Sequence, residues 1–203
     1  MDNYEYIVAS LPVLRQEDIR PESLHADALV SEIREQLSSR DQVLLDFLLD
    51  GYDPDKMTED FYTRALAHRN RFLREWFTFD LDLRNTTVAY LNHQLKRDED
   101  LDLIQLPGRE EAEFPEKANA ESILHGIDIM KRERNLDDLR WQKIDEITIQ
   151  DFFDIEAILG FVAKLKIIDR WLQLDPESGR VLFRRMVEDI RSTYDNKKQD
   201  ITI

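Results

Sequence analysis

The chain has 203 residues, of which 28 are Lys or Arg and 43 are Asp or Glu, so its net charge is −15. This excess of acids argues against a general nucleic-acid binder and against adsorption to anionic lipid, because both need surplus Lys and Arg. The absence of Cys excludes disulfides, zinc–thiolate sites and thiol nucleophiles. No long uncharged apolar stretch occurs, so we expect a cytoplasmic protein without a signal peptide or direct membrane insertion.

The low content of Gly and Pro favours helices. Only 5 Gly and 6 Pro occur in the whole chain. Sheets joined by tight turns and glycine-rich phosphate loops need more of both. An all-α fold is therefore expected.

The first predicted element is a short extended segment over 4–9, which is aromatic and β-branched. Residues 201–203 have the same character, so the two segments are candidates for a short terminal β pairing. The next element is a helix over 24–37, in which apolar residues recur every four positions and share one face.

A capping box opens the following helix, with Ser39 as the cap and Gln42 at its third position. Gly51 is a plausible end for that helix. Helical character then continues over 58–97 without Gly or Pro. Forty residues of straight helix would be about 60 Å long, whereas a compact chain of this length has a radius of gyration of about 17 Å. We therefore predict either an elongated molecule or a break within 80–87, where Asp, Asn and Thr lower helix propensity.

Residues 98–119 are rich in acids and contain Pro and Gly, which predicts an acidic linker or long surface loop. It divides the chain into an N-terminal helical half, 1–97, and a C-terminal helical half, 120–203. Four helices are predicted in the second half, over 120–133, 136–144, 149–173 and 175–194.

An internal repeat is suggested by two segments 74 residues apart, since 79–82 and 153–156 share the order aromatic, acid, aliphatic, acid. The helical stretch that each of these segments begins ends in a base, at Lys96 in the first copy and at Arg170 in the second. Acids near the start of a helix and a base near its end complement the helix dipole. The alternative is a chance match between two amphipathic helices. The fold class predicted on this basis is an elongated helical bundle with internal repeats.

Several residues at helical spacing are predicted to lie in the core. They are Trp76, Phe79, Phe152, Leu159 and Val162.

No sequence motif for catalysis or for nucleotide or metal binding is recognisable. The four histidines form no metal-binding pattern. Four carboxylates are candidates for catalytic pairs around an acquired metal, but helix capping and pairing with Arg84 and other bases is the preferred explanation. The four carboxylates are Asp80, Asp82, Asp154 and Glu156. We predict a protein that is not an enzyme and that has no cofactor and no metal.

The opening residues 3–12, Asn-Tyr-Glu-Tyr-Ile-Val-Ala-Ser-Leu-Pro, resemble the start of a bacterial family of unknown function that is encoded among the genes of V-type ATPases. That family is regarded as a counterpart of the C-type subunit of the archaeal or V-type enzyme, whose eukaryotic form is the d-type subunit. The segment 82–97 is similar to a recurrent element of the C-type subunit, which is all-helical and built from repeats.

The resemblance implies a non-catalytic subunit or accessory factor of a bacterial V-type ATPase, with a coupling or socket role between the central shaft and the membrane ring. Its partners would be those other parts of the V-type ATPase, and it would be peripheral on the cytoplasmic side of the membrane. The isolated chain is expected to be a monomer. The candidate interface or repeat-motif residues are Asp80, Asp82, Arg84, Asn85, Asp154 and Glu156.

Two alternatives remain open from the sequence. One is a cytosolic helical adaptor for protein interactions, unrelated to the ATPase. The other is a metal-dependent enzyme, which requires the four carboxylates to converge within reach of one ion.

Overall fold

A computed structural model describes residues 4–15, 25–109 and 112–173. The chain divides into two compact units. The first spans Met1–Leu14 and His25–Ile167, and nearly all described residues belong to it. The second spans Arg15–Leu24 and Ile168–Ile203 and is described only at residue 15 and over 168–173. The helix predicted over 175–194 lies outside the described residues.

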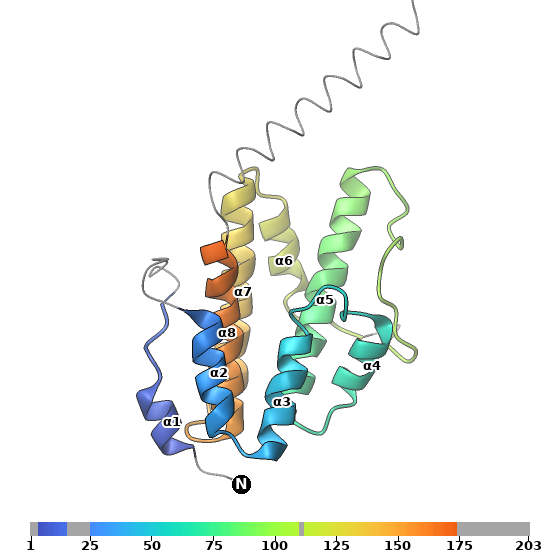
Figure 1. Ribbon diagram of the computed structural model, residues 1–203. Helices are drawn as coiled ribbons and strands as arrows, with labels where there is room; N and C mark the ends of the chain where they lie inside the picture. The colour runs from blue at the N-terminus through green and yellow to red at the C-terminus, as the bar shows by residue number, and fades with distance from the viewer. Residues whose placement is uncertain (1–3, 16–24, 110–111, 174–203) are drawn as a thin grey trace, which may run out of the picture. The chain divides into compact units, whose positions relative to one another are not determined.

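The described residues are helical and contain no strand, which confirms the all-α fold class (Figure 1). The helices are α1 (Glu5–Ser10), α2 (Ala26–Gln36), α3 (Ser39–Asp50), α4 (Glu59–Leu66), α5 (Arg71–Gln94), α6 (Lys117–Leu124), α7 (Ile129–Thr148) and α8 (Ile155–Gln173). None of these helices is long and apolar enough to cross a membrane.

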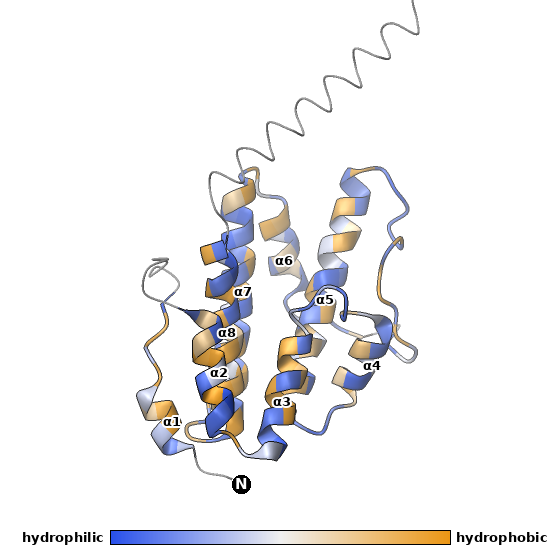
Figure 2. Cartoon of the chain, viewed as in Figure 1, coloured by the Kyte–Doolittle hydropathy of each residue, from blue (hydrophilic) through white to orange (hydrophobic). Residues whose placement is uncertain are grey.

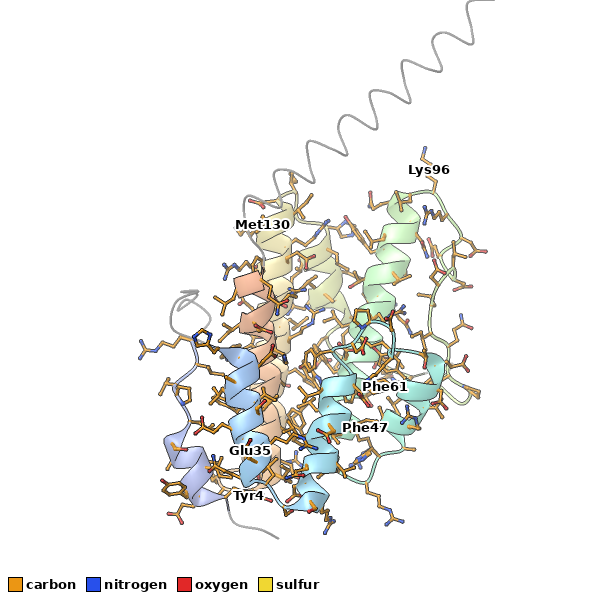
Figure 3. All side chains as sticks on the ribbon, in the orientation of Figure 1. Tyr4, Glu35, Phe47, Phe61, Lys96 and Met130 are labelled. Atoms are coloured by element: carbon orange, nitrogen blue, oxygen red, sulfur yellow. The ribbon has the colours of Figure 1, made fainter. Side chains whose placement is uncertain are left out.

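Helix α5 is central to the first unit and packs against α4, α6 and α7. Apolar and polar residues alternate around the helices (Figure 2), as expected where one face of each is buried. Part of the core is an aromatic cluster between α3, α4 and α5. Phe61 packs edge-on to Phe77 at a centroid distance of 4.9 Å and stacks on Phe47 at 5.2 Å. Phe47 and Phe61 are labelled in Figure 3.

Two glycines permit close approach of side chains in this core. A Cβ at Gly51 would lie 2.2 Å from Cε1 of Phe77, so the glycine leaves room for the ring. A Cβ at Gly160 would lie 2.7 Å from Cγ2 of Thr148, so the glycine lets α8 pack closely on the end of α7. Gly51 is the residue after α3, as predicted, although its backbone remains right-handed.

The N-terminal segment is a helix, so the extended structure predicted over 4–9 is wrong. The reason is tertiary. Tyr4 lies immediately before α1, where its backbone N–H donates to the carbonyl of Phe153 at 2.8 Å and its hydroxyl donates to Asp41 at 2.5 Å. The helix also buries Ile7. The other predicted partner of the β pairing, 201–203, lies outside the described residues.

The helical segment after Gly51 breaks earlier than predicted. The predicted break within 80–87 is wrong, because α5 runs through it. Thr86 and Thr87 donate their hydroxyls to helix carbonyls four residues back, so neither interrupts the helix. The break lies at 67–70, where Asn70 caps α5 by accepting the N–H of Leu73 at 3.0 Å.

Helix boundaries also differ elsewhere. The predicted helix over 24–37 is confirmed as α2, and the cap of α3 is Ser38, one residue before the predicted Ser39. The helices predicted over 120–133 and 136–144 are wrong in extent. Helix α6 ends at Leu124, and α7 is one helix that Asp128 caps.

Four of the five predicted core residues are buried. Trp76, Phe79, Leu159 and Val162 are each at most 3% exposed. Phe152 is 67% exposed, so its predicted burial is wrong. It belongs to the turn between α7 and α8, because α8 begins at Ile155 rather than at 149.

The two segments of the proposed repeat occupy different positions in their helices. Asp154 precedes α8 and caps it, since its carboxylate accepts the N–H of Ala157 at 3.1 Å. Asp80 instead lies in the middle of α5. The prediction that both acids mark helix starts is therefore wrong for Asp80. The aromatic residues also differ, since Phe79 is 3% and Phe153 is 47% exposed.

Candidate interaction site

A segment that we call the strap, residues 98–109, follows α5 and returns along it in the opposite direction. Asn85 makes two hydrogen bonds to Ile104, donating to its carbonyl at 2.8 Å and accepting its N–H at 3.0 Å. Asn92, one of the few buried polar residues, donates to the carbonyl of Leu101 at 2.6 Å. Later strap residues thus pair with earlier helix residues. The acidic linker or long surface loop predicted over 98–119 is packed against α5 in its first half, and it lies within the first compact unit.

Two more of the predicted residues hold the strap. Asp82 accepts two hydrogen bonds from one terminal nitrogen of Arg109, each at 2.8 Å. Arg84 donates to the carbonyl of Asp102 at 3.4 Å. The predicted interface residues Asp82, Arg84 and Asn85 therefore make contacts within the chain.

Turns within the strap allow this path. Asp102 and Gly108 within the strap adopt positive φ angles of 63° and 81°, and Lys96, just before it, has a φ of 55°; each bends or reverses the chain. Asp98 accepts the N–H of Asp100 at 3.1 Å, a local turn typical of aspartate. Leu106 is then buried, at 8% exposure, and anchors the end of the strap.

The end of the strap forms one wall of a cavity of about 910 Å³, which we call the groove. Helices α4, α5 and α7 and residues 113–116 form the other walls. The charged lining residues are Arg74, Glu75, Asp82, Arg109, Glu113, Glu116, Lys143 and Glu146. The apolar lining residues are Leu66, Ala67, Phe79, Leu106, Pro107, Phe114, Pro115 and Ile147.

Two ion pairs connect different walls of the groove to one another. Arg109 pairs with Asp82 as above, and the Nζ of Lys143 lies 2.6 Å from Oε1 of Glu116. Burial raises the pKa of Asp82, and the positive charge of Arg109 opposes this effect only in part. Burial lowers the pKa of Lys143, but the hydrogen bond and charge of Glu116 outweigh it, so the net shift is upward. Each of these four side chains is at most 23% exposed.

Asp80 faces the interior and not the groove. Its carboxylate accepts the hydroxyl of Tyr62 at 2.7 Å. Burial raises the pKa of Asp80, and the bond from Tyr62 and the charges of Arg140 and Arg84 offset this only in part. Its role in the structure is a polar contact between α4 and α5.

The two candidate acids at the start of α8, Asp154 and Glu156, do not line the groove and have other partners. Asp154 caps α8, and Glu156 accepts the side-chain N–H of Asn70 at 3.0 Å. The second oxygen of Glu156 is buried without a hydrogen-bond partner, and burial raises the pKa of this side chain.

The four candidate carboxylates do not meet, because Asp80, Asp82 and Glu156 each have a different partner and Asp154 caps a helix. Within the described ranges, no group of three or more His, Asp or Glu side chains is arranged to hold a metal ion.

Three residues of the groove, Arg109, Glu116 and Lys143, carry no motif in the sequence. Both ion pairs join residues 27 positions apart, a separation that no local spacing rule anticipates. Only Pro107, Gly108 and Pro115 signal turns in this region. Chemically, the groove offers apolar walls and negative charge to a binding partner.

Comparison with known protein families gives a match over most of the chain. The model of the family described as "Protein of unknown function (DUF2764)" matches residues 52–194, a stretch that runs from before α4 to beyond α8 and includes the groove. No curated protein matches the chain, and no solved structure matches it.

Proposed function

We propose, from the premise that the chain belongs to the DUF2764 family of proteins of unknown function, that it is a non-catalytic subunit or accessory factor of a bacterial V-type ATPase. It would act on the cytoplasmic side of the membrane, bound to the complex, in a coupling or socket role between central shaft and membrane ring.

The link to this ATPase rests on the resemblance of residues 3–12 to proteins encoded among its genes. The structural observation that supports a binding role is the groove, an apolar cavity with acidic residues at its edge, on an all-helical unit. A mechanical role requires a rigid body and a binding surface and needs no reactive group. The contacts of Asp82, Arg84 and Asn85 with the strap favour a part for these residues in rigidity.

The deciding experiment is affinity purification of the full chain from its native cell, with identification of the proteins that come with it. Proteins of the shaft or the ring are the expected partners. Deletion of the gene is expected to reduce ATP-driven ion pumping while the catalytic head still hydrolyses ATP. Unchanged pumping together with unchanged assembly of the complex would rule out this function.

The alternative is a helical adaptor for another protein, which the groove supports equally. Reproducible purification with partners outside the ATPase, and none from it, would favour the adaptor.

A further inference from the structure

We infer that the groove binds a segment of a partner protein that carries apolar side chains flanked by Lys or Arg. This inference rests on the proposed function in one respect, namely that the occupant is a protein. The chemistry of the occupant follows from the walls of the groove.

The size and the apolar walls of the groove fit side chains of a partner. Its volume of about 910 Å³ lies in the range of about 300–1,000 Å³ typical of ligand sites. Leu66 and Ala67 come from the end of α4, and Phe114 and Pro115 come from the segment before α6. Phe114 and Leu66 are partly exposed, and Ala67 and Pro115 are exposed, so apolar surface on two sides is open to an occupant.

The charges of the groove select a basic occupant. Five acids and three bases line it. Arg109 pairs with Asp82 at 2.8 Å. Lys143 pairs with Glu116 at 2.6 Å and with Glu146 at 3.4 Å. The third base, Arg74, donates to the backbone carbonyl of His68 at 3.0 Å. Glu75 lies 3.6 Å from Arg71, which is outside the groove lining.

The acids at the edge of the groove are more exposed than its bases. Glu113 is exposed, and the side chain of Glu146 is 67% exposed, whereas those of Arg109 and Lys143 are 22% and 23% exposed. An incoming Lys or Arg therefore meets carboxylates first. The net charge of −15 adds a field of the same sign, which attracts a basic segment and repels nucleic acid and anionic lipid.

The test uses the purified full chain and two fluorescein-labelled peptides, one of leucine and lysine and one in which every lysine is replaced by glutamate. Fluorescence anisotropy is expected to show saturable binding of the lysine peptide and none of the glutamate peptide. Equal binding of both peptides, or binding of neither, would overturn the inference.

Blocking variants separate the groove from general attraction by an acidic surface. Ala67→Trp fills the groove from an exposed position and is expected to weaken binding by about tenfold, since it removes the apolar site. Thr63→Trp, on the same exposed wall, is the second blocking variant if the first one folds poorly. Circular dichroism and melting temperature report whether each variant is folded. Full affinity of folded blocking variants would place binding elsewhere.

A matched pair of charge reversals completes the test. Glu113→Lys with Glu146→Lys reverses two acids of the groove, and Glu35→Lys with Asp138→Lys makes the same charge change at exposed positions on α2 and α7 (Glu35 is labelled in Figure 3). The groove pair is expected to weaken binding by roughly tenfold and the control pair by less than about twofold, since only the former places like charges next to the occupant. Equal losses would show that net charge alone attracts the peptide.

These outcomes are independent of the ATPase. If the groove binds the peptide but no ATPase component co-purifies with the chain, the proposed function is contradicted and the inference about the groove stands. If ATPase components still co-purify with the Ala67→Trp variant, the proposed function stands and the groove is not the surface that binds them.

Discussion

The partly buried carboxylate of Asp80 couples the stability of the fold to pH. Burial raises its pKa above the ordinary value of 3.8, even though it accepts a hydrogen bond from Tyr62. The folded state therefore holds this proton more tightly than the unfolded state. This group's contribution to the free energy of unfolding falls as pH rises from the unfolded pKa to the folded pKa, and is constant above it.

Asp80→Asn is expected to remove this pH dependence, because the neutral amide can still accept the hydroxyl of Tyr62. Urea unfolding across the acidic range measures it. The difference in free energy of unfolding, variant minus wild type, should grow as pH rises. Asp138→Asn, at an exposed position on α7, controls for loss of a surface charge. A difference that is flat with pH would contradict the role assigned to Asp80.

Residue 51 must be glycine for the core to pack, because a Cβ there would overlap a neighbouring ring. Gly51→Ala is expected to lower the free energy of unfolding by about 1–3 kcal/mol, because an added methyl group overlaps a ring in a filled core. The ring is that of Phe77, which is 1% exposed and packs edge-on against Phe61 at a centroid distance of 4.9 Å. Chemical denaturation measures the loss.

Phe77→Leu provides the matched test of this clash, since it shortens the obstructing side chain. The double variant Gly51→Ala, Phe77→Leu is expected to lose less stability than the sum of the two single variants. Strict additivity would mean that the methyl group and the ring do not compete for space.

At the scale of elements, the strap is held to α5 by side-chain contacts to its backbone. Asn85→Ala removes both bonds to Ile104 and is expected to cost about 1–2 kcal/mol. Amide hydrogen exchange should become faster at Ile104 and along the strap, since the segment opens locally without its clamp.

Gln142→Ala, at an exposed position on α7, is the matched control for removal of an amide side chain. It should leave exchange in the strap unchanged. Unchanged exchange at Ile104 in the Asn85→Ala variant would show that Asp82–Arg109 and the buried Leu106 hold the strap without it.

At the scale of the whole molecule, net charge opposes self-association. The chain exposes several large apolar residues, including Tyr6 at 82%, Ile127 at 101% and Phe152 at 67%. A charge of −15 counters their tendency to associate at neutral pH. Sedimentation velocity at pH 7 is expected to find a monomer of 24.2 kDa.

Association should increase as pH falls toward the isoelectric point of about 4.7, because the repulsion between copies disappears there. A dimer at pH 7 in low salt would show that a specific self-contact outweighs the repulsion.

Much of the architecture followed from local patterns in the sequence. The scarcity of Gly and Pro and the period of the apolar residues determined an all-α fold, and the same period identified Trp76, Phe79, Leu159 and Val162 as core. These predictions depend on which face of a helix a residue occupies, and spacing alone decides that.

Only the tertiary structure decided where helices begin and end and which polar residues meet. Intrinsic propensity favoured a break within 80–87, yet α5 begins earlier, where Asn70 caps it. The helix continues through 80–87 because the side chains of Asn85 and Thr86 form hydrogen bonds without interrupting it. Propensities differ by less than about 1 kcal/mol per residue, so one capping bond or a buried face outweighs them. The groove depends on contacts 27 residues apart, Asp82 with Arg109 and Glu116 with Lys143, and such pairs exist only once α5, the strap and α7 have packed.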